Sequence, residues 1–199
     1  MLTLNIEELK NNLLKKYQDC AKKYKISTDK YMDRYNHSIG VFNMAMELKN
    51  LYNLDVDDDK IALASIYHDY AKFCSMDDYK YIVKKYDLDI DILKTPFKVL
   101  HSKLGCYVVM DELTVYDEDV FNAIKTHTTG SDNMSFLQEL IYISDLVEMG
   151  RKEDYFIQMR RMAKKNIKKA IATSLRDTII RLSALGSELD KDTVAAMIE

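Results

Sequence analysis

The chain has 199 residues, 47% of them hydrophobic and 31% charged, so it can build one sizeable core but is short for two independent domains. Its formal net charge of -3 provides no general positive field for nucleic acid or an anionic membrane. No run approaches the roughly 18 apolar residues of a membrane span, and the first residues lack the layout of a secretory signal. We therefore expect a cytoplasmic protein.

Few residues that break helices are present. The chain has five glycines and a single proline, Pro96, and these do not recur at the short spacing that the turns of an all-β fold require. This composition predicts an all-α fold. The three cysteines, Cys20, Cys74 and Cys106, form no CxxC pair and predict neither a disulfide framework nor a thiolate metal site, so we expect buried thiols.

The first third of the chain predicts three helices. Apolar residues return at helical intervals from Ile6 to about Tyr24. A second helix is expected to begin at the capping oxygens of Ser27, Thr28 and Asp29 and to end at about Leu51. Negative charge precedes the third helix, where it suits the positive end of the helix dipole, with an acidic ligand site as the alternative interpretation; the residues are Asp55, Asp57, Asp58 and Asp59.

The remaining chain also predicts helices. One or two short helices are expected from Met76 to Leu93, and after Pro96 one helix is expected to carry Phe97, His101, Leu104 and Val108 on one side. The TTGSDN segment (128–133) predicts a loop. Helices are expected from about residue 152 onward, with a break near Gly186.

Two segments have alternative interpretations. The basic run RRMAKKNIKK (160–169) could contact nucleic acid, but its apolar neighbours favour a docked helix with a solvated basic face. The run YKYIVKKY (79–86) could stack an adenine ring, but amphipathic tyrosines on a helix surface are commoner.

All four histidines continue an apolar helical face, and two aspartates accompany them. Asp69 directly follows a histidine, and Asp145 lies on a buried face with no lysine or arginine three or four positions away. A hydrogen bond to the backbone would be enough to explain any one buried histidine. Burying four imidazoles and two carboxylates together is costly, and bound cations would offset that cost for all six; the residues are His37, His68, Asp69, His101, His127 and Asp145.

The order H, HD, H, H, D resembles that of the HD-domain metal-dependent phosphohydrolases. Within them the chain resembles the bacterial YqeK family of symmetrical diadenosine tetraphosphate hydrolases through RYNHSIGV (34–41), HDYAK (68–72), VLHSKLG (99–105), AIKTHTTGSDNMS (123–135) and IYISDLVE (141–148). This resemblance implies one all-helical HD domain over residues 1–199, with family motifs in 33–151 and helices of 152–199 packed on it. The chain departs from the family pattern at two pairs of positions that flank the expected nucleotide pocket, Ser102–Lys103 and Met149–Gly150.

The resemblance also implies a pair of metal ions. One ion would be held by His37, His68, Asp69 and Asp145, and the other by His101 and His127, with Asp69 bridging the two. A ligand set of imidazole and carboxylate without thiolate suits iron, manganese or cobalt, and the family implies iron. Asp69 is thereby expected to be catalytic.

Substrate contacts are expected from cationic and hydroxyl side chains near these ligands. Lys72, one turn after His68, is the expected catalytic and phosphate-binding lysine, with a solvated lysine at a helix end as the alternative. The Thr128, Thr129 and Gly130 loop could cradle phosphate with its hydroxyl and N–H groups, or could be an ordinary helix-ending turn. Arg34 and Arg151 are further candidates.

The function that the resemblance implies is hydrolysis of diadenosine tetraphosphate into two ADP molecules. The alternatives are an HD phosphohydrolase that acts on other nucleotides and a non-catalytic HD module that binds metal or nucleotide. We expect a nucleotide substrate, no nucleic-acid or membrane partner, and a monomer or homodimer.

Overall fold

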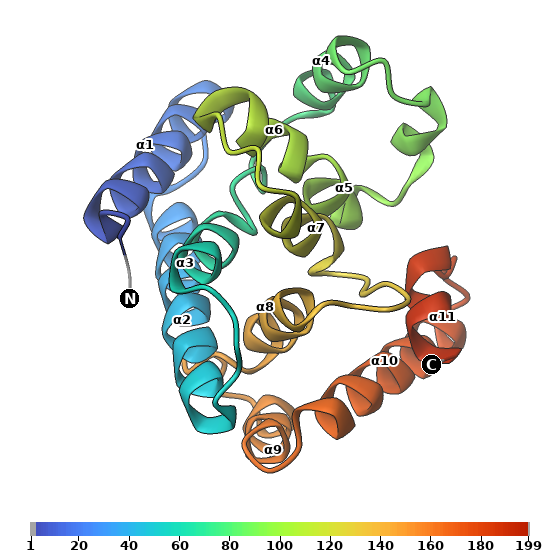
Figure 1. Ribbon diagram of the computed structural model, residues 1–199. Helices are drawn as coiled ribbons and strands as arrows, with labels where there is room; N and C mark the ends of the chain where they lie inside the picture. Colours follow the sequence, from blue (N-terminus) through green and yellow to red (C-terminus); the bar gives the residue numbers. More distant parts are fainter. Residues whose placement is uncertain (1–2, 199) are drawn as a thin grey trace.

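The computed structural model describes residues 3–198, and every regular element in that range is a helix (Figure 1). The all-α prediction is confirmed. The elements are α1 (Ile6–Tyr24), α2 (Thr28–Tyr52), α3 (Asp58–Tyr67), α4 (Met76–Lys85), the 3-10 helix η1 (Ile90–Lys94), α5 (Phe97–Lys103), α6 (Gly105–Leu113), α7 (Glu118–Thr126), α8 (Phe136–Val147), α9 (Asp154–Ala163), α10 (Ile167–Ala184) and α11 (Lys191–Ile198).

The helices that carry the candidate ligands lie against one another. α2 lies along α3 and α8, and α7 contacts α3, α5 and α8 (Figure 1). Their shared core contains side chains with no exposed surface, including Leu48, Ile61, Leu100 and Leu140. Burial of each such side chain contributes about 1.5 to 3 kcal/mol, so the apolar faces hold these helices against one another.

The aspartates at the start of α3 have capping and pairing roles. The Asp57 side chain accepts hydrogen bonds from the N–H groups of the first turn, Asp58 pairs with Lys49, and Asp59 accepts from the N–H of Thr3. Within residues 3–198 none of the three belongs to a group of side chains that could hold a metal. The capping prediction is therefore confirmed for this segment.

The single helix predicted after Pro96 is wrong, because the chain forms α5 and α6 with a change of direction at Leu104. Phe97, predicted to face the core, has 53% of its surface exposed. A Cβ at Gly105 would lie 3.3 Å from the Cβ of Ala71. The first turn of α6 thus packs closely against the segment that follows the HD dipeptide.

The basic run 160–169 is also interrupted. α9 ends at Ala163, and Asn166 caps the start of α10. Met159, Ala163 and Ile167 are buried, so the run packs against the core as predicted. It does so as the end of α9 and the start of α10, not as one helix. The predicted break near Gly186 is confirmed, since that residue has a positive φ of 62° just after α10.

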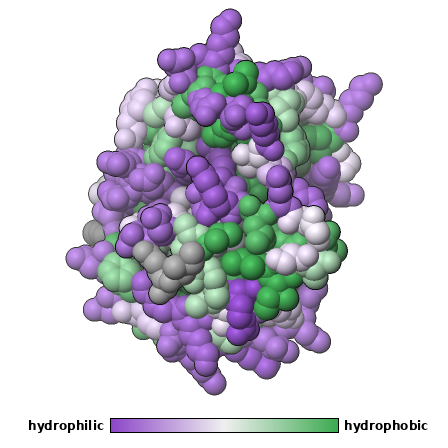
Figure 2. Space-filling view, turned by 90° about the vertical axis from the view of Figure 1, so that its right-hand side faces the viewer, coloured by the Kyte–Doolittle hydropathy of each residue, from purple (hydrophilic) through white to green (hydrophobic). Residues whose placement is uncertain are grey.

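The YKYIVKKY segment forms most of α4 and is amphipathic, as predicted. Tyr79 is buried and its hydroxyl donates to the Ala71 carbonyl, whereas Tyr81 is exposed. The three cysteines are free and buried. Among residues 3–198, none of the helices combines the length and apolar character needed to cross a membrane. Figure 2 shows one face of the molecule, where hydrophilic side chains surround a hydrophobic area in the lower half.

Candidate metal centre

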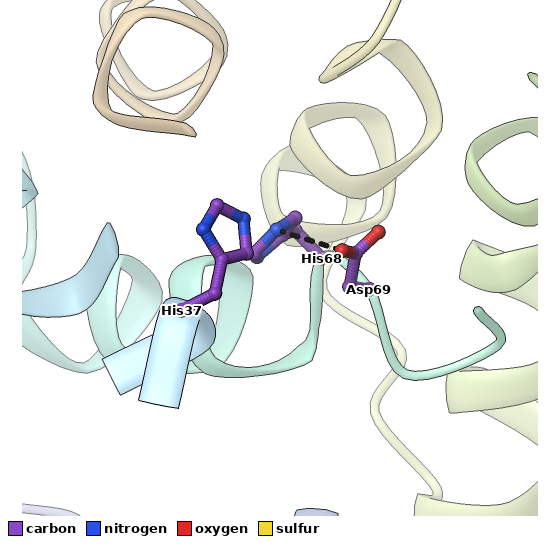
Figure 3. A group of neighbouring side chains, drawn as sticks. All are labelled: His37, His68 and Asp69. Atoms are coloured by element: carbon purple, nitrogen blue, oxygen red, sulfur yellow. Dashed lines mark ion pairs between the residues drawn. The ribbon is translucent and has the colours of Figure 1, made fainter. Parts of the chain in front are cut away.

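The six predicted ligands come from five separate helical segments and meet in the interior. His37 lies within α2, and His68 and Asp69 follow the last residue of α3; Figure 3 shows the three side chains close together. His101 lies in α5 and Asp145 in α8. His127 follows the last residue of α7. His68, Asp69, His101 and His127 are each at most 3% exposed.

Asp69 stands between three of the imidazoles. Its Oδ1 lies 2.9 Å from His101 Nε2 and 3.6 Å from His127 Nε2, and its Oδ2 lies 3.6 Å from His68 Nε2. The two oxygens of one carboxylate therefore face different histidines. A single aspartate in such a position can contact two cations at once.

Three groups of side chains have ligand atoms within 4.8 Å of one another. Two of the groups divide the ligands as the sequence predicts. The third joins His68, His127 and Asp145, so proximity alone does not separate the ligands of one expected ion from those of the other. The groups are His37–His68–Asp69, His68–His127–Asp145 and Asp69–His101–His127.

Several of these atoms have close neighbours but no hydrogen bond. His37 Nε2 lies 2.9 Å from Asp145 Oδ1, and Asp69 Oδ1 lies 2.9 Å from His101 Nε2. Even so, three of these buried atoms have no hydrogen-bond partner among the described residues: His37 Nε2, Asp69 Oδ1 and His68 Nε2. Buried ligand atoms that lie within 4.8 Å of one another and have no hydrogen-bond partner fit a bound cation.

Hydrogen bonds fix which nitrogen of two histidines is available. His68 Nδ1 lies 2.7 Å from the carbonyl oxygen of Ser65, and His127 Nδ1 lies 2.7 Å from that of Ile124. A carbonyl only accepts, so Nδ1 donates in both rings. In the neutral imidazole, Nε2 then carries the lone pair that a metal ion needs.

The charges of the centre follow from its burial and its carboxylates. Burial lowers the pKa of His68 to about 3, which keeps this imidazole neutral. Burial also acts against the charge on His37, but Asp145 and Glu148 outweigh it and raise the pKa of His37 to about 9. Burial would raise the pKa of Asp69, but His68 and His101 hold it well below its usual value.

Two arginines pair with the carboxylates of the centre. Arg34 Nη1 lies 2.8 Å from Asp69 Oδ2. Arg151 Nη2 lies 2.9 Å from Asp145 Oδ1, and its Nε donates to the Asp145 carbonyl oxygen at 2.7 Å. The sequence pattern did not predict this partner for Asp145, because Arg151 lies six positions later, beyond the end of α8.

Lys72 lies at the edge of the same centre. Its Nζ is 2.9 Å from His101 Nε2 and 3.4 Å from Asp69 Oδ1. The side chain borders a cavity of about 690 Å³ that opens beside the ligands. The lining residues are Ser27, Asp29, Lys30, Asp33, Arg34, His37, Lys72, Phe73 and Arg151.

The loop after the fourth histidine uses its own hydrogen-bonding groups. The N–H groups of Thr129 and Gly130 donate to the carbonyl oxygen of Thr126 at 3.2 and 2.8 Å. The Thr128 hydroxyl is 2.6 Å from that of Ser102, which links α5 to the loop. The backbone here forms a helix-ending turn, so two of the N–H groups expected to cradle phosphate are already paired.

The departures from the family pattern have identifiable contacts. Lys103 Nζ lies 2.6 Å from Asp190 Oδ2 and 3.1 Å from Asp192 Oδ2, so it ties α5 to the start of α11. Met149 and Gly150 border a second cavity, of about 550 Å³, which His37 also lines.

Sequence reasoning missed one carboxylate. Glu148 is 4% exposed, and its Oε1 lies 3.2 Å from His37 Nδ1. The residue belongs to the IYISDLVE motif, three positions after Asp145, and that spacing could have identified it.

Comparisons with known proteins agree with this geometry. Residues 34–150 match the family model described as HD domain. The symmetrical bis(5'-nucleosyl)-tetraphosphatase of Halalkalibacterium halodurans is 38% identical over 162 residues, which cover 81% of this chain and 86% of the relative. The protein of the same name from Bacillus subtilis is 32% identical over 160 residues, 80% of this chain and 85% of the relative.

A solved structure extends the likeness to nearly the whole chain. It is the crystal structure of a predicted HD superfamily hydrolase involved in NAD metabolism from Clostridium acetobutylicum. The match has a TM-score of 0.81 at 28% identity and covers 98% of this chain and 96% of the other. The chain therefore belongs to the HD domain family, and its relatives over most of its length carry the name symmetrical bis(5'-nucleosyl)-tetraphosphatase, as the sequence motifs predicted.

Proposed function

We propose that this protein is a metal-dependent phosphohydrolase that cleaves diadenosine tetraphosphate symmetrically into two ADP molecules. The observation that carries the proposal is the convergence of four imidazoles and two carboxylates beside a cavity bordered by cationic side chains. The names of the relatives support the choice of substrate.

The proposed cofactor is a pair of transition-metal ions, with iron preferred over manganese or cobalt. His37, His68, Asp69 and Asp145 would hold one ion, and His101, His127 and Asp69 the other. The two directions in which the Asp69 oxygens face support its bridging role. When bound, such ions polarise phosphate oxygens and lower the pKa of a nearby water toward neutrality.

The side chains around the cavity would bind and orient the polyphosphate. Arg34, Lys72 and Arg151 line it and carry N–H donors that suit phosphate oxygens. Four of the ligands, His68, Asp69, His101 and His127, are buried, and charge interactions are stronger where bulk water is absent. The Thr128 to Gly130 turn remains a predicted contact, through the hydroxyl of Thr128.

Symmetrical cleavage needs room for half of the substrate on each side of the reacting phosphate. His37 lines both the cavity of about 690 Å³ and the cavity of about 550 Å³, so the two cavities adjoin at one candidate ligand. One half could lie among Lys30, Arg34 and Lys72, and the other beside Tyr35 and Met149. This arrangement supports a two-part substrate over a mononucleotide.

The test combines metal analysis with product analysis. Protein purified without added metal is analysed for its elements, then incubated with diadenosine tetraphosphate and Fe²⁺, Mn²⁺ or Co²⁺. Two ADP per substrate, with no ATP or AMP, is the expected result. Turnover of other nucleotides without ADP from this substrate would favour a different HD phosphohydrolase. If no metal supports turnover of any nucleotide, the chain is a non-catalytic binding module.

A further inference from the structure

Glu148 is a buried carboxylate directly beside the candidate metal centre. It follows the last residue of α8, and its side chain is 5% exposed. Its Oε1 lies 3.2 Å from His37 Nδ1, on the opposite side of the ring from the Nε2 that lies 2.9 Å from Asp145. Among residues 3–198, His37 is the only ion-pair partner of this carboxylate.

Two glycines leave space for the Glu148 carboxylate. A Cβ at Gly40, one turn after His37 in α2, would lie 2.5 Å from Glu148 Oε2, and a Cβ at Gly150 would lie 2.8 Å from it. Neither glycine has a positive φ. The close approach of the Glu148 side chain therefore explains why these positions are glycine, since no unusual backbone conformation requires it. The Gly150 N–H also donates to Glu148 Oε2. Two segments of the chain thus hold the carboxylate in one place.

Other histidines of the centre are oriented in a different way. His68 and His127 follow the ends of α3 and α7, where the last carbonyl groups of a helix have no partner within it. Each ring donates Nδ1–H to such a carbonyl, that of Ser65 or Ile124. His37 lies inside α2, where the helix's own hydrogen bonds engage the neighbouring carbonyls. An acceptor for its Nδ1–H must therefore come from elsewhere.

We propose that Glu148 is a positioning residue that accepts a hydrogen bond from His37 Nδ1–H and thereby directs His37 Nε2 at the metal ion. The inference rests on the proposed metal centre. A carboxylate partner fixes the tautomer and orientation of a ligating imidazole and makes it a better electron donor. Glu148 needs no contact with substrate for this role.

The test measures binding of Co²⁺ to protein from which metal has been removed with a chelator. Glu148→Gln keeps the volume of the side chain and removes its charge, and we expect Co²⁺ affinity to fall about 10- to 100-fold. Glu139→Gln is the matched control, since Glu139 lies on α8, is 6% exposed and pairs with Lys168 away from the centre. The control is expected to bind Co²⁺ like the wild type.

A second comparison separates positioning from a merely structural role. If Glu148 acts through His37, Glu148→Gln lowers Co²⁺ affinity no further in a His37→Ala background. An equal loss of affinity in both backgrounds, or wild-type affinity in Glu148→Gln alone, would overturn the proposal.

A second variant covers the case in which Glu148→Gln does not fold, as judged by circular dichroism. Gly40→Ala adds a methyl group on α2 that pushes the Glu148 carboxylate away from His37, and it is expected to weaken Co²⁺ binding. Unchanged affinity in a folded Gly40→Ala protein would then count against the proposal.

The same titration distinguishes the two proposals. A wild-type protein that binds no Co²⁺ would overturn the role of Glu148 together with the metal centre. A wild-type protein that binds Co²⁺ but releases no ADP from diadenosine tetraphosphate would overturn the proposed function only, and the role of Glu148 would still be decided by affinity.

Discussion

Arg151 lies beyond the end of α8, and its guanidinium reaches back to bind both the carboxylate and the backbone carbonyl of Asp145. The two N–H groups that make these contacts belong to one planar fork, with the carboxylate 2.9 Å and the carbonyl 2.7 Å away. A lysine has a single ammonium group and cannot reproduce this pair of contacts. Arg151 thus holds the partly buried Asp145 carboxylate as well as bordering the cavity.

We expect Arg151→Gln to lower the free energy of unfolding of the metal-free protein by about 1 to 3 kcal/mol, because Asp145 loses a charged hydrogen-bond donor. Arg151→Lys should recover only part of that loss. Urea denaturation measures both. Arg176→Gln is the control, because Arg176 pairs with its neighbour Asp177 at an exposed site. Equal stability of Arg151→Gln and the wild type would show that the Arg151 contacts contribute nothing.

Asp69→Asn should remove metal binding and hydrolysis together. The substitution keeps the shape of the side chain but removes the charge that faces His68 and His101. We expect the rate of ADP release to fall at least about 100-fold. Metal content by elemental analysis and ADP release by chromatography check the two effects. Retention of full activity by Asp69→Asn would refute the bridging role.

Lys72→Met should weaken substrate binding more than metal binding. Lys72 Nζ lies near His101 and Asp69 at the border of the larger cavity, where a phosphate would offer it a charged acceptor. Loss of one charged hydrogen bond predicts a rise in KM of about tenfold or more, with the metal content unchanged. Steady-state kinetics measure the rise. Lys94→Met, which removes an exposed lysine paired with Asp91, should leave KM as it is.

The pH dependence of metal-free stability should depend on His37. Burial opposes its charge, but Asp145 and Glu148 raise its pKa from 6.5 to about 9, so the folded state binds the proton more tightly than the unfolded state. That contribution to stability is fully present below about pH 6.5 and is lost as the pH rises to about 9. Urea denaturation from pH 6 to pH 9.5 should show this decline in the wild type, and His37→Asn should lack most of it. Parallel curves for the two proteins would contradict the prediction.

The sequence was sufficient for the fold class and for most helix positions, because apolar residues at helical spacing mark the buried face of each helix. The same spacing placed the four histidines and Asp145 on inward faces, and the structure brings them together. Features that depend on contacts between helices were not predictable. The turn at Leu104 brings Gly105 close to Ala71, and no local sequence pattern records that contact.

The surroundings of the candidate ligands were harder to predict than the ligands themselves. Arg151 was not predicted as the partner of Asp145, because partners were sought three or four positions away on one helix and Arg151 lies beyond the end of α8. The sequence carried no prediction for Glu148, and only the arrangement of α2 against α8 shows that it is buried against His37. The N–H groups of Thr129 and Gly130 could not be assigned to the turn until its hydrogen bonds were known.

His68 and His127 each donate to a carbonyl that is free because the helix stops just before the histidine. Anyone grafting this centre into an unrelated helical scaffold would therefore have to copy the stopping points of two helices as well as the six side chains. A scaffold in which α3 or α7 continued for another turn would use those carbonyls in its own backbone, and the transplanted rings would be free to rotate.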